Sequence, residues 1–416
     1  MAFKKFFYGC LLACLLIVSP IVADTWKLFF YMDSSDNLSD MAIKNITDMM
    51  RGKPNDTVDV VIQLHAYDSA ALRYQVTSAG LTFLEETTIS GDGKQDFIDA
   101  ASWALAHNTA DHAMLIFSNH GWGALDPHWN AEAAAWEVAG MGMNNSANTC
   151  PLSMTIKKSH HELHKGFMFN AHAHSYLTNQ ALDEGLAYIQ ENLLQGNKID
   201  IVAFDTCMGS MLEVATCVAP YAQYLVGVQS CALRDGFDYQ GFIDVLNQGI
   251  APRQTCIEFV HAFDKYYCEH DKAGIYTCAS LDLKCVDTVN EALNEVVAEL
   301  LQYPEWIPLI MQARDKTHRF CLWPIYTDLV AFCKLVEDRL LELPTCDAIE
   351  LLFGKMHTLY SAAETMAIAR CGGSTTYGKA YGFSIYLPTH SLENSYLSSL
   401  FAQHSQWPHL LTEICK

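Results

Sequence analysis

The amino-acid sequence predicts an α/β fold in which helices cover both faces of a mostly parallel central sheet. Short apolar runs rich in β-branched and aromatic residues recur along the first half of the chain. Such runs are expected of strands that are buried on both faces. Amphipathic helical patterns separate these runs, and strands that alternate with helices are typical of a doubly wound sheet.

The expected elements of the first half follow one another without long interruptions until residue 124. The helix after the first strand is capped by Asp36 or Ser39 and ends near Met50. A strand begins at Ile199, and the helix that follows it has Glu213 in its first turn. The other expected elements are strands at 25–32, 58–64, 113–118 and 224–229, a hairpin of 74–76 and 81–83, and helices at 94–106 and 178–194.

The second half of the chain is richer in helical patterns. Helices are expected at 285–302, 328–341 and 348–359, and strands at 275–279 and 383–386. We therefore divide the chain into three parts. These are a targeting segment at 1–23, a core at 24–248 with an insertion at 124–177, and a helix-rich C-terminal subdomain at 249–416 that supports the core.

Length and charge restrict the possible partners. The chain has 416 residues, of which 50% are apolar, so it can bury a large core. Its formal net charge of −21 argues against a nucleic-acid partner, because phosphate contacts require lysine and arginine. An acidic surface instead favours cationic partners and guides them toward a site.

The first 23 residues resemble a secretory signal peptide. A short basic start that ends at Lys5 precedes an apolar stretch from Phe6 to Val18, and small residues precede Asp24. These are the three parts of such a signal. The apolar stretch is short for a membrane span, and no other stretch qualifies. We expect an exported protein without a stable membrane span.

Cys207 is the first candidate catalytic residue. It follows the strand that begins at Ile199, at the edge where open α/β sheets place their ligands. Gly209 and Ser210 mark a turn into a helix, and a helix N-terminus lowers the pKa of a thiol. A lone cysteine is more often a small buried apolar residue.

His120 is the second candidate. It follows the apolar strand at 113–118 and precedes Gly121. If both strands belong to one sheet, His120 and Cys207 emerge at the same edge, which is the arrangement of a nucleophile and its base. Although a lone histidine is usually only a satisfied polar group, the pair favours catalysis.

Asp205 and Asp235 lie at the carboxyl ends of neighbouring expected strands, close to the Cys207 and His120 pair. Two carboxylates at the base of a pocket suit a guanidinium or ammonium group. The alternative for Asp235 is a simple turn residue, because it precedes Gly236, and Arg234 could neutralise its charge.

The insertion at 124–177 has little regular pattern and many histidines. The histidines are His160, His161, His164, His172 and His174. A metal site is conceivable there, although a long surface loop beside the active site is the simpler interpretation.

Of the 15 cysteines, two fall in the targeting segment, so an odd number remain. This number fits one free nucleophile and several disulfides, or mostly buried thiols.

Together these motifs resemble the clostripain family of cysteine peptidases (family C11), which belongs to the caspase-like clan. The likeness spans roughly residues 26–388, and its motifs are specific in combination. They are Tyr31-Met32 with Asp36-Asn37-Leu38, Phe117 to Gly123, Phe204-Asp205-Thr206-Cys207-Met208-Gly209-Ser210, Val226 to Gln229 with Asp235 to Tyr239, and Ala380 to Pro388.

The resemblance implies a caspase-like α/β/α sandwich that hydrolyses peptide bonds through a thioester. Cys207 would attack the carbonyl and His120 would transfer protons, while the backbone N–H groups of Gly121 and Cys207 would form the oxyanion hole. Residues at Asp205 and Asp235 would form the S1 pocket, so that protein or peptide substrates are cut after Arg or Lys. Because some relatives require calcium, calcium is a possible cofactor, although the sequence itself requires none and shows no calcium loop.

Several positions depart from the family pattern. Thr206 replaces the common alanine, and one residue is missing from the turn after Cys207. The segment 229–231 lacks the usual glutamate-rich turn, which weakens the assignment of S1. Relatives often mature by cutting their own chain in the loop that follows the catalytic histidine. Lys157, Lys158 and Lys165 are candidates here, although their spacing matches poorly.

Two other functions compete with that of a peptidase. The first is a catalytically silent caspase-like binding protein whose acidic cleft holds a cationic peptide. The second is a metal-binding exported protein that uses the histidine-rich insertion. Because both His120 and Cys207 are present, we expect an exported cysteine endopeptidase.

Overall fold

The computed structural model describes residues 24–34, 38–65, 70–126, 128–130, 135–137, 167–170, 175–271, 273–320, 325–374 and 377–415. The predicted signal peptide at 1–23 lies outside these residues. The histidines named for the insertion, the three candidate lysines and most of the insertion itself also lie outside these residues.

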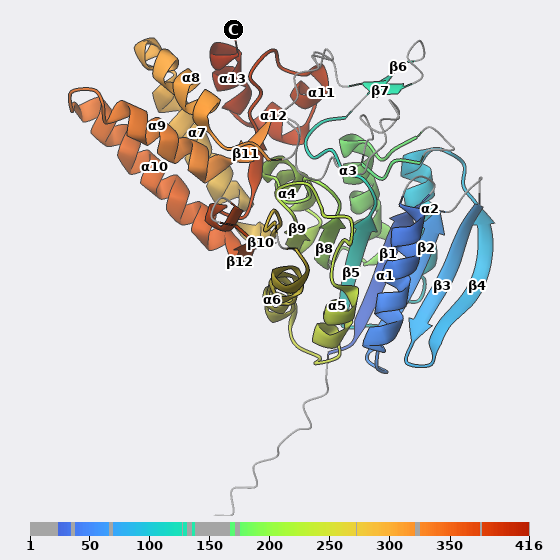
Figure 1. Ribbon diagram of the computed structural model, residues 1–416. Coiled ribbons are helices and arrows are strands. Elements are labelled where there is room, and N and C mark those ends of the chain that lie inside the picture. The colour runs from blue at the N-terminus through green and yellow to red at the C-terminus, as the bar shows by residue number, and fades with distance from the viewer. Residues whose placement is uncertain are drawn as a thin grey trace, which may run out of the picture.

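A nine-stranded sheet with the order β12-β10-β9-β8-β5-β1-β2-β3-β4 forms the centre of the protein (Figure 1). The five middle strands are parallel, and two antiparallel strands extend the sheet on each side. The strands are β1 (Trp26–Asp33), β2 (Val58–His65), β3 (Ala70–Thr77), β4 (Gly80–Thr88), β5 (His112–Ser118), β8 (Ile199–Asp205), β9 (Ala222–Gly227), β10 (Thr277–Asp282) and β12 (Ala367–Gly372). The predicted fold class is confirmed.

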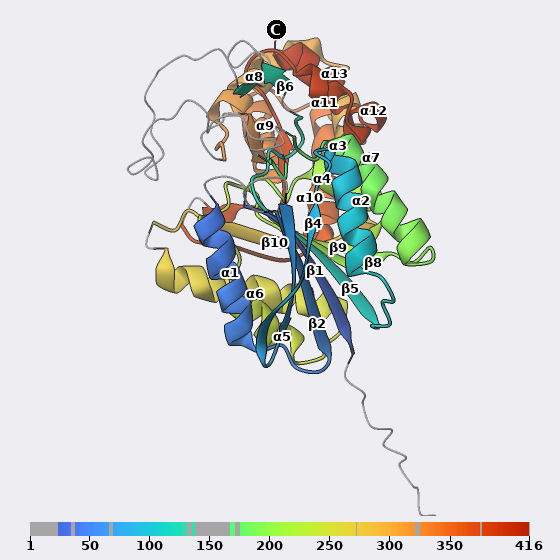
Figure 2. The ribbon, with the colours of Figure 1, turned by 90° about the vertical axis from the view of Figure 1, so that its right-hand side faces the viewer.

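Helices cover both faces of the sheet (Figure 2). On one face the apolar side chains of the sheet pack against α1 (Ser39–Gly52), α5 (Tyr239–Leu246) and α6 (Pro252–His270). The opposite face packs against α2 (Gly93–Ala104), α3 (Asn179–Tyr188), which continues as a π-helical turn at Ile189–Leu193, and α4 (Leu212–Val218).

Strand β1 shows why the middle of the sheet is built from nearly continuous apolar runs. Leu28 and Phe30 point into the core under α1 and α5, and Phe29 and Tyr31 point into the core under α2. All four side chains are buried. Because side chains alternate between the faces of a strand, a strand that is covered on both sides needs apolar residues at every position.

The second half of the chain adds helices beside the sheet, at the side that carries β12 (Figure 1). Two further small antiparallel sheets pair β11 with β13 and β6 with β7. The remaining elements are β6 (His128–Asn130), β7 (Ala135–Glu137), α7 (Val286–Leu300), α8 (Ile307–Lys316), β11 (Tyr326–Asp328), α9 (Leu329–Leu340), α10 (Asp347–Met366), β13 (Ser384–Tyr386), α11 (Asn394–Leu397), α12 (Leu400–His404) and α13 (Trp407–Ile414). Single-turn 3₁₀ helices lie at Leu283–Cys285, Pro304–Trp306 and Tyr377–Lys379.

The boundary between residues 248 and 249 stays a prediction. Two strands that follow it, β10 and β12, belong to the same sheet as the strands before it. Helix α6 also follows the boundary and packs against the sheet core. The helices that stand farther from the sheet are those from α7 onward.

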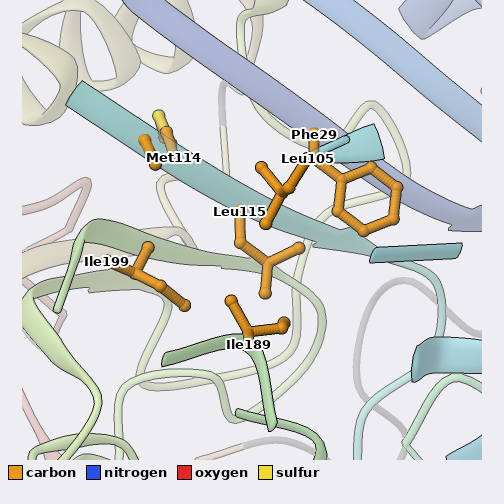
Figure 3. Close-up of a pocket in the computed structure, with 7 residues that line it drawn as sticks. Phe29, Leu105, Met114, Leu115, Ile189 and Ile199 are labelled. Carbon is orange, nitrogen blue, oxygen red and sulfur yellow. The ribbon is translucent and has the colours of Figure 1, made fainter. Parts of the chain in front are cut away.

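The core beneath β5 leaves little empty space. A cavity of about 10 Å³ lies between β1, β5, β8 and the π-helical turn, and only apolar side chains line it (Figure 3). A hollow of this size holds at most one water molecule, and an apolar lining offers that water no partner. This cavity is too small for a substrate, and open α/β sheets place their ligands at the carboxyl ends of the strands.

Candidate active site

The register of two neighbouring strands places the candidate catalytic residues. β5 and β8 pair in parallel, and Ser118 lies opposite Asp205 at their carboxyl ends. His120 and Cys207 are each the second residue after this pair. The two residues therefore follow adjacent strands and lie at the same edge of the sheet. The sequence predicted the common edge.

Two loops follow the paired strand ends: the histidine loop at 119–123 and the cysteine loop at 206–211. Gly121 brings the histidine loop against the cysteine loop. A Cβ atom at this position would lie 2.3 Å from the carbonyl oxygen of Cys207 and 2.6 Å from Oγ1 of Thr206. Real Cβ contacts are essentially never shorter than 3.0 Å. Glycine is therefore required for this close approach, and the backbone after His120 contacts the backbone of Cys207.

The environment of Cys207 differs from the expectation. Burial raises the pKa of the Cys207 thiol, and the charge of Asp205 acts in the same direction, while the backbone N–H of Ala232 opposes both. The helix predicted after the Cys207 turn is present, since α4 begins at Leu212 and has Glu213 in its first turn. Cys207 is half-buried, and because burial disfavours the thiolate, a base must accept the thiol proton if Cys207 is to act as a nucleophile.

A turn at Met208 lies between Cys207 and α4. Met208 adopts a left-handed conformation with φ of 58°, which is uncommon for a residue with a side chain and occurs often at functional sites. Its N–H donates to the carbonyl of Ser230 at 2.9 Å, and the N–H of Ser210 donates to the carbonyl of Val228 at 2.9 Å. The cysteine loop is thus fixed to the segment after β9.

Asn119 fixes the histidine loop from the other side. Its side-chain oxygen accepts from the backbone N–H groups of His120 and Phe169, and its amide nitrogen donates to the carbonyl of Asp33. The side chain is buried. Asn119 was not among the predicted site residues, although its position directly before His120 in the same motif is a signal for it.

Asp205 is a buried carboxylate with a specific partner. The hydroxyl of Tyr239 donates to it at 2.6 Å. Gly236 has φ of +67°, and a Cβ atom there would meet Oδ2 of Asp205 at 2.5 Å. Burial raises the pKa of Asp205 to about 6, although the hydrogen bonds from Tyr239 and the N–H of Phe237 lower it. Asp205 thus fastens the end of β8 to the loop before α5.

Asp235 is more accessible than Asp205. It is half-buried and accepts a hydrogen bond from the hydroxyl of Tyr266 at 3.1 Å. Arg234 is exposed. Gly236 directly follows Asp235 and packs closely against Asp205, so the loop that carries Asp235 reaches the end of β8. Tyr239 belongs to the Asp235 to Tyr239 motif but had no predicted role, and Tyr266 was not predicted.

The C-terminal part of the chain supports the same loops. The N–H of Ser384 donates to the carbonyl of Ser210 at 2.9 Å, and the Ser210 hydroxyl donates to the carbonyl of Gly382 at 2.6 Å. The side-chain amide of Gln229 donates to buried Asp328 at 2.9 Å. The three partners Ser384, Gly382 and Asp328 lie in β13, in the segment before β13 and in β11. Sequence spacing could not connect these segments to the site.

Neither a metal site nor a membrane helix is found in the described part of the chain. No three histidine, cysteine, aspartate or glutamate side chains gather there where they could hold a metal ion. Within the same ranges, no helix has the length and apolar character that crossing a membrane requires. Most of the described cysteines, with Cys207 among them, are free thiols, whereas Cys231 is disulfide-bonded.

The fold and the site together define a caspase-like α/β protein with a cysteine and a histidine at adjacent strand ends. A model of the clostripain family (Peptidase C11) matches residues 173–412, which is more than half of the chain. The chain therefore belongs to the clostripain family, and the protein is a cysteine peptidase.

Solved structures show the same fold. A secreted C11 cysteine protease from Bacteroides thetaiotaomicron superposes with a TM-score of 0.66 at 15% identity, covering 92% of this chain and 99% of that one. Its complex with an irreversible peptide inhibitor gives 0.65 at 12% identity, with the same coverage. An inactive zymogen C11 protease from Parabacteroides distasonis gives 0.56 at 13% identity, covering 95% of this chain and 99% of that one. No curated protein matches the chain.

Proposed function

We propose that Cys207 and His120 form the dyad of this peptidase. The observation that carries the proposal is the register of β5 and β8, which places both residues two positions beyond the paired Ser118 and Asp205. His120 takes the thiol proton, the thiolate attacks the substrate carbonyl, and His120 then protonates the leaving amine. Water hydrolyses the resulting thioester and regenerates the thiol.

Backbone N–H groups of Gly121 and Cys207 complete the proposed site. The close contact between Gly121 and the backbone of Cys207 supports this assignment, because it brings the two backbone segments together. Since burial raises the pKa of Cys207, the neutral thiol is favoured in the resting enzyme. Proton transfer to His120 is therefore part of the reaction, and the oxyanion donors lower the barrier of the following attack.

We further propose that Asp205 and Asp235 select Arg or Lys at P1. Asp235 is half-buried and stands on the loop that contacts Asp205, so it is the more accessible carboxylate. Asp205, with a pKa of about 6, is ionised at neutral pH and adds a negative charge at the end of β8. The overall charge of −21 would draw cationic substrates to this edge of the sheet.

A series of fluorogenic peptides with Arg, Lys, Asp, Asn or Leu at P1 tests this specificity. We expect turnover after Arg or Lys, and a loss of roughly 10-fold or more in kcat/KM for these peptides in Asp235→Asn. The matched control is Asp244→Asn, which removes an exposed carboxylate of α5. Turnover after Leu or Asn alone would keep the peptidase and reject the S1 assignment.

Export and cofactor use are separate proposals. We propose that residues 1–23 direct export, so that the N-terminus of the protein recovered from the medium or periplasm is Asp24. N-terminal sequencing of that protein tests this directly. We also propose that hydrolysis needs no metal ion, and activity measured with a calcium chelator and with added calcium decides the question. Activity that depends on added calcium would overturn this second proposal.

A further inference from the structure

Tyr326 connects the C-terminal part of the chain to the loop that follows His120. It lies in β11 with its side chain fully buried, and its hydroxyl donates to the carbonyl oxygen of Trp122 at 2.5 Å. The two residues are 204 positions apart in the chain. Because Trp122 follows Gly121 directly, this hydrogen bond acts next to the proposed oxyanion donor.

A second hydrogen bond holds the same loop on the other side of Gly121. The backbone N–H of Met168 donates to the carbonyl oxygen of His120 at 3.1 Å. This carbonyl and the N–H of Gly121 belong to one planar trans peptide unit, so they point in opposite directions. Fixing the carbonyl of His120 therefore also fixes the direction of the Gly121 N–H.

The loop needs such anchors because of its composition. Gly121 and Gly123 flank Trp122, and glycine gives the backbone more freedom than any other residue. Gly123 has φ of +68°, in the left-handed region. Without the hydrogen bonds at His120 and Trp122, the peptide units around Gly121 could rotate, and an oxyanion donor is effective only when its direction is set beforehand.

We propose that Tyr326 is a positioning residue that orients the Gly121 N–H for the oxyanion. The inference rests on the proposed function, in which this N–H stabilises the tetrahedral intermediate formed at Cys207. Tyr326 itself touches neither substrate nor reacting atoms. The pair of anchors, Met168 before Gly121 and Tyr326 after it, holds the donor in one direction. The C-terminal segment thus contributes to the orientation of the catalytic loop as well as to packing.

The test compares Tyr326→Phe with Tyr386→Phe in the full chain. Tyr386 lies opposite Tyr326 in the pairing of β11 with β13, and its hydroxyl accepts from the N–H of Glu393, a residue outside both catalytic loops. Both variants therefore lose one buried hydroxyl in the same small sheet. The substrate is the fluorogenic peptide that the unaltered enzyme cleaves fastest, and kcat and KM are measured separately.

Two reagents separate orientation of the donor from folding and from thiol reactivity. A peptide aldehyde adds to the thiol and places an oxygen in the oxyanion site, whereas iodoacetamide alkylates the thiol by displacing iodide and needs no such site. For Tyr326→Phe we expect kcat to fall roughly 10- to 100-fold with KM within about twofold. The inhibition constant of the aldehyde should rise in parallel, while the iodoacetamide rate stays within about twofold.

Equal losses of kcat in Tyr326→Phe and Tyr386→Phe would show a general packing effect and would overturn the positioning role of Tyr326. Unchanged aldehyde affinity in Tyr326→Phe, or a parallel fall in iodoacetamide reactivity, would also overturn it. If the unaltered enzyme cleaves no peptide, the proposed function itself fails. If that enzyme is active and Tyr326→Phe matches it, only this inference fails.

Discussion

The backbone of Gly121 packs against the carbonyl oxygen of Cys207, and a Cβ atom at residue 121 would lie 2.3 Å from that oxygen. This contact joins the ends of β5 and β8 above the sheet. It follows that the histidine and cysteine loops cannot move independently. The contact also makes the site sensitive to a single methyl group at residue 121.

Gly121→Ala should reduce kcat/KM by about 100-fold or more, because the added methyl must push the two catalytic loops apart. The neighbouring atoms are backbone and Thr206, so little can yield, and we expect a loss of about 1–3 kcal/mol in the free energy of unfolding. Peptide hydrolysis and urea unfolding measure both effects.

Gly354→Ala is the control for this substitution. Gly354 is an exposed residue inside α10, and a Cβ atom there would meet nothing within 4 Å. Alanine is preferred to glycine inside a helix by about 0.5–1 kcal/mol. The control should therefore unfold at slightly higher urea with unchanged activity. Equal activity of both variants would contradict the close contact at Gly121.

Asn119→Ala should weaken both stability and activity. It leaves the N–H groups of His120 and Phe169 and the carbonyl of Asp33 without their side-chain partner. Each buried polar group that loses a partner costs roughly 1–3 kcal/mol, and relaxation offsets part of the sum. We expect the free energy of unfolding to fall by about 2–4 kcal/mol, with a lower kcat from a displaced histidine loop.

Asn197→Ala provides the comparison for Asn119. Its side chain donates to the carbonyl of Leu194 at an exposed position, so its loss should change the free energy of unfolding by less than about 0.5 kcal/mol. Urea unfolding and kcat are measured for both variants. Similar values for the two would show that Asn119 does not organise the histidine loop.

Glu213 predicts a pH dependence of stability. Its carboxylate is buried in α4 and accepts from the N–H of Tyr386 at 2.9 Å and the hydroxyl of Tyr396 at 3.2 Å. Burial nevertheless raises its pKa from 4.5 to about 7. The folded protein therefore binds more protons than the unfolded chain between pH 4.5 and 7. The stability that Glu213 contributes is complete below pH 4.5 and is lost as the pH rises through 7.

Glu213→Gln should remove this part of the pH dependence, because glutamine is neutral and keeps an acceptor oxygen for Tyr386 and Tyr396. The difference in unfolding free energy, variant minus unaltered protein, should grow by about 1–3 kcal/mol between pH 4.5 and pH 8. Asp126, Asp205 and Glu393 also have raised pKa values, and the difference cancels their contributions. A difference that does not change with pH would show that Glu213 titrates normally.

The sequence predicted the part of the fold that follows from burial on both faces. Strands such as 113–118 and 58–64 are apolar at nearly every position, so they were found within one residue of β5 and β2. The predicted hairpin of 74–76 and 81–83 is present, since Val76 pairs with Leu81 in β3 and β4. The motifs around His120 and Cys207 predicted their common edge because parallel strands end on one side of a sheet.

The features that were missed depend on contacts between distant residues. The turn and the helix after Cys207 were predicted, but the left-handed conformation of Met208 within that turn was not. The partners of the site loops, Tyr326 and Ser384, lie well over 100 residues from them. Neither propensity nor spacing carries information about such contacts, which tertiary packing determines.

The dyad is tested most directly by peptide hydrolysis with four proteins: the unaltered enzyme, Cys207→Ala, His120→Ala and Cys268→Ala. Cys268 is an exposed free thiol and controls for the loss of a thiol outside the site. We predict that kcat/KM falls by about 1,000-fold or more in the first two variants and changes less than about twofold in the third. Hydrolysis by Cys207→Ala at the rate of the unaltered enzyme would contradict the assignment of Cys207 as the nucleophile.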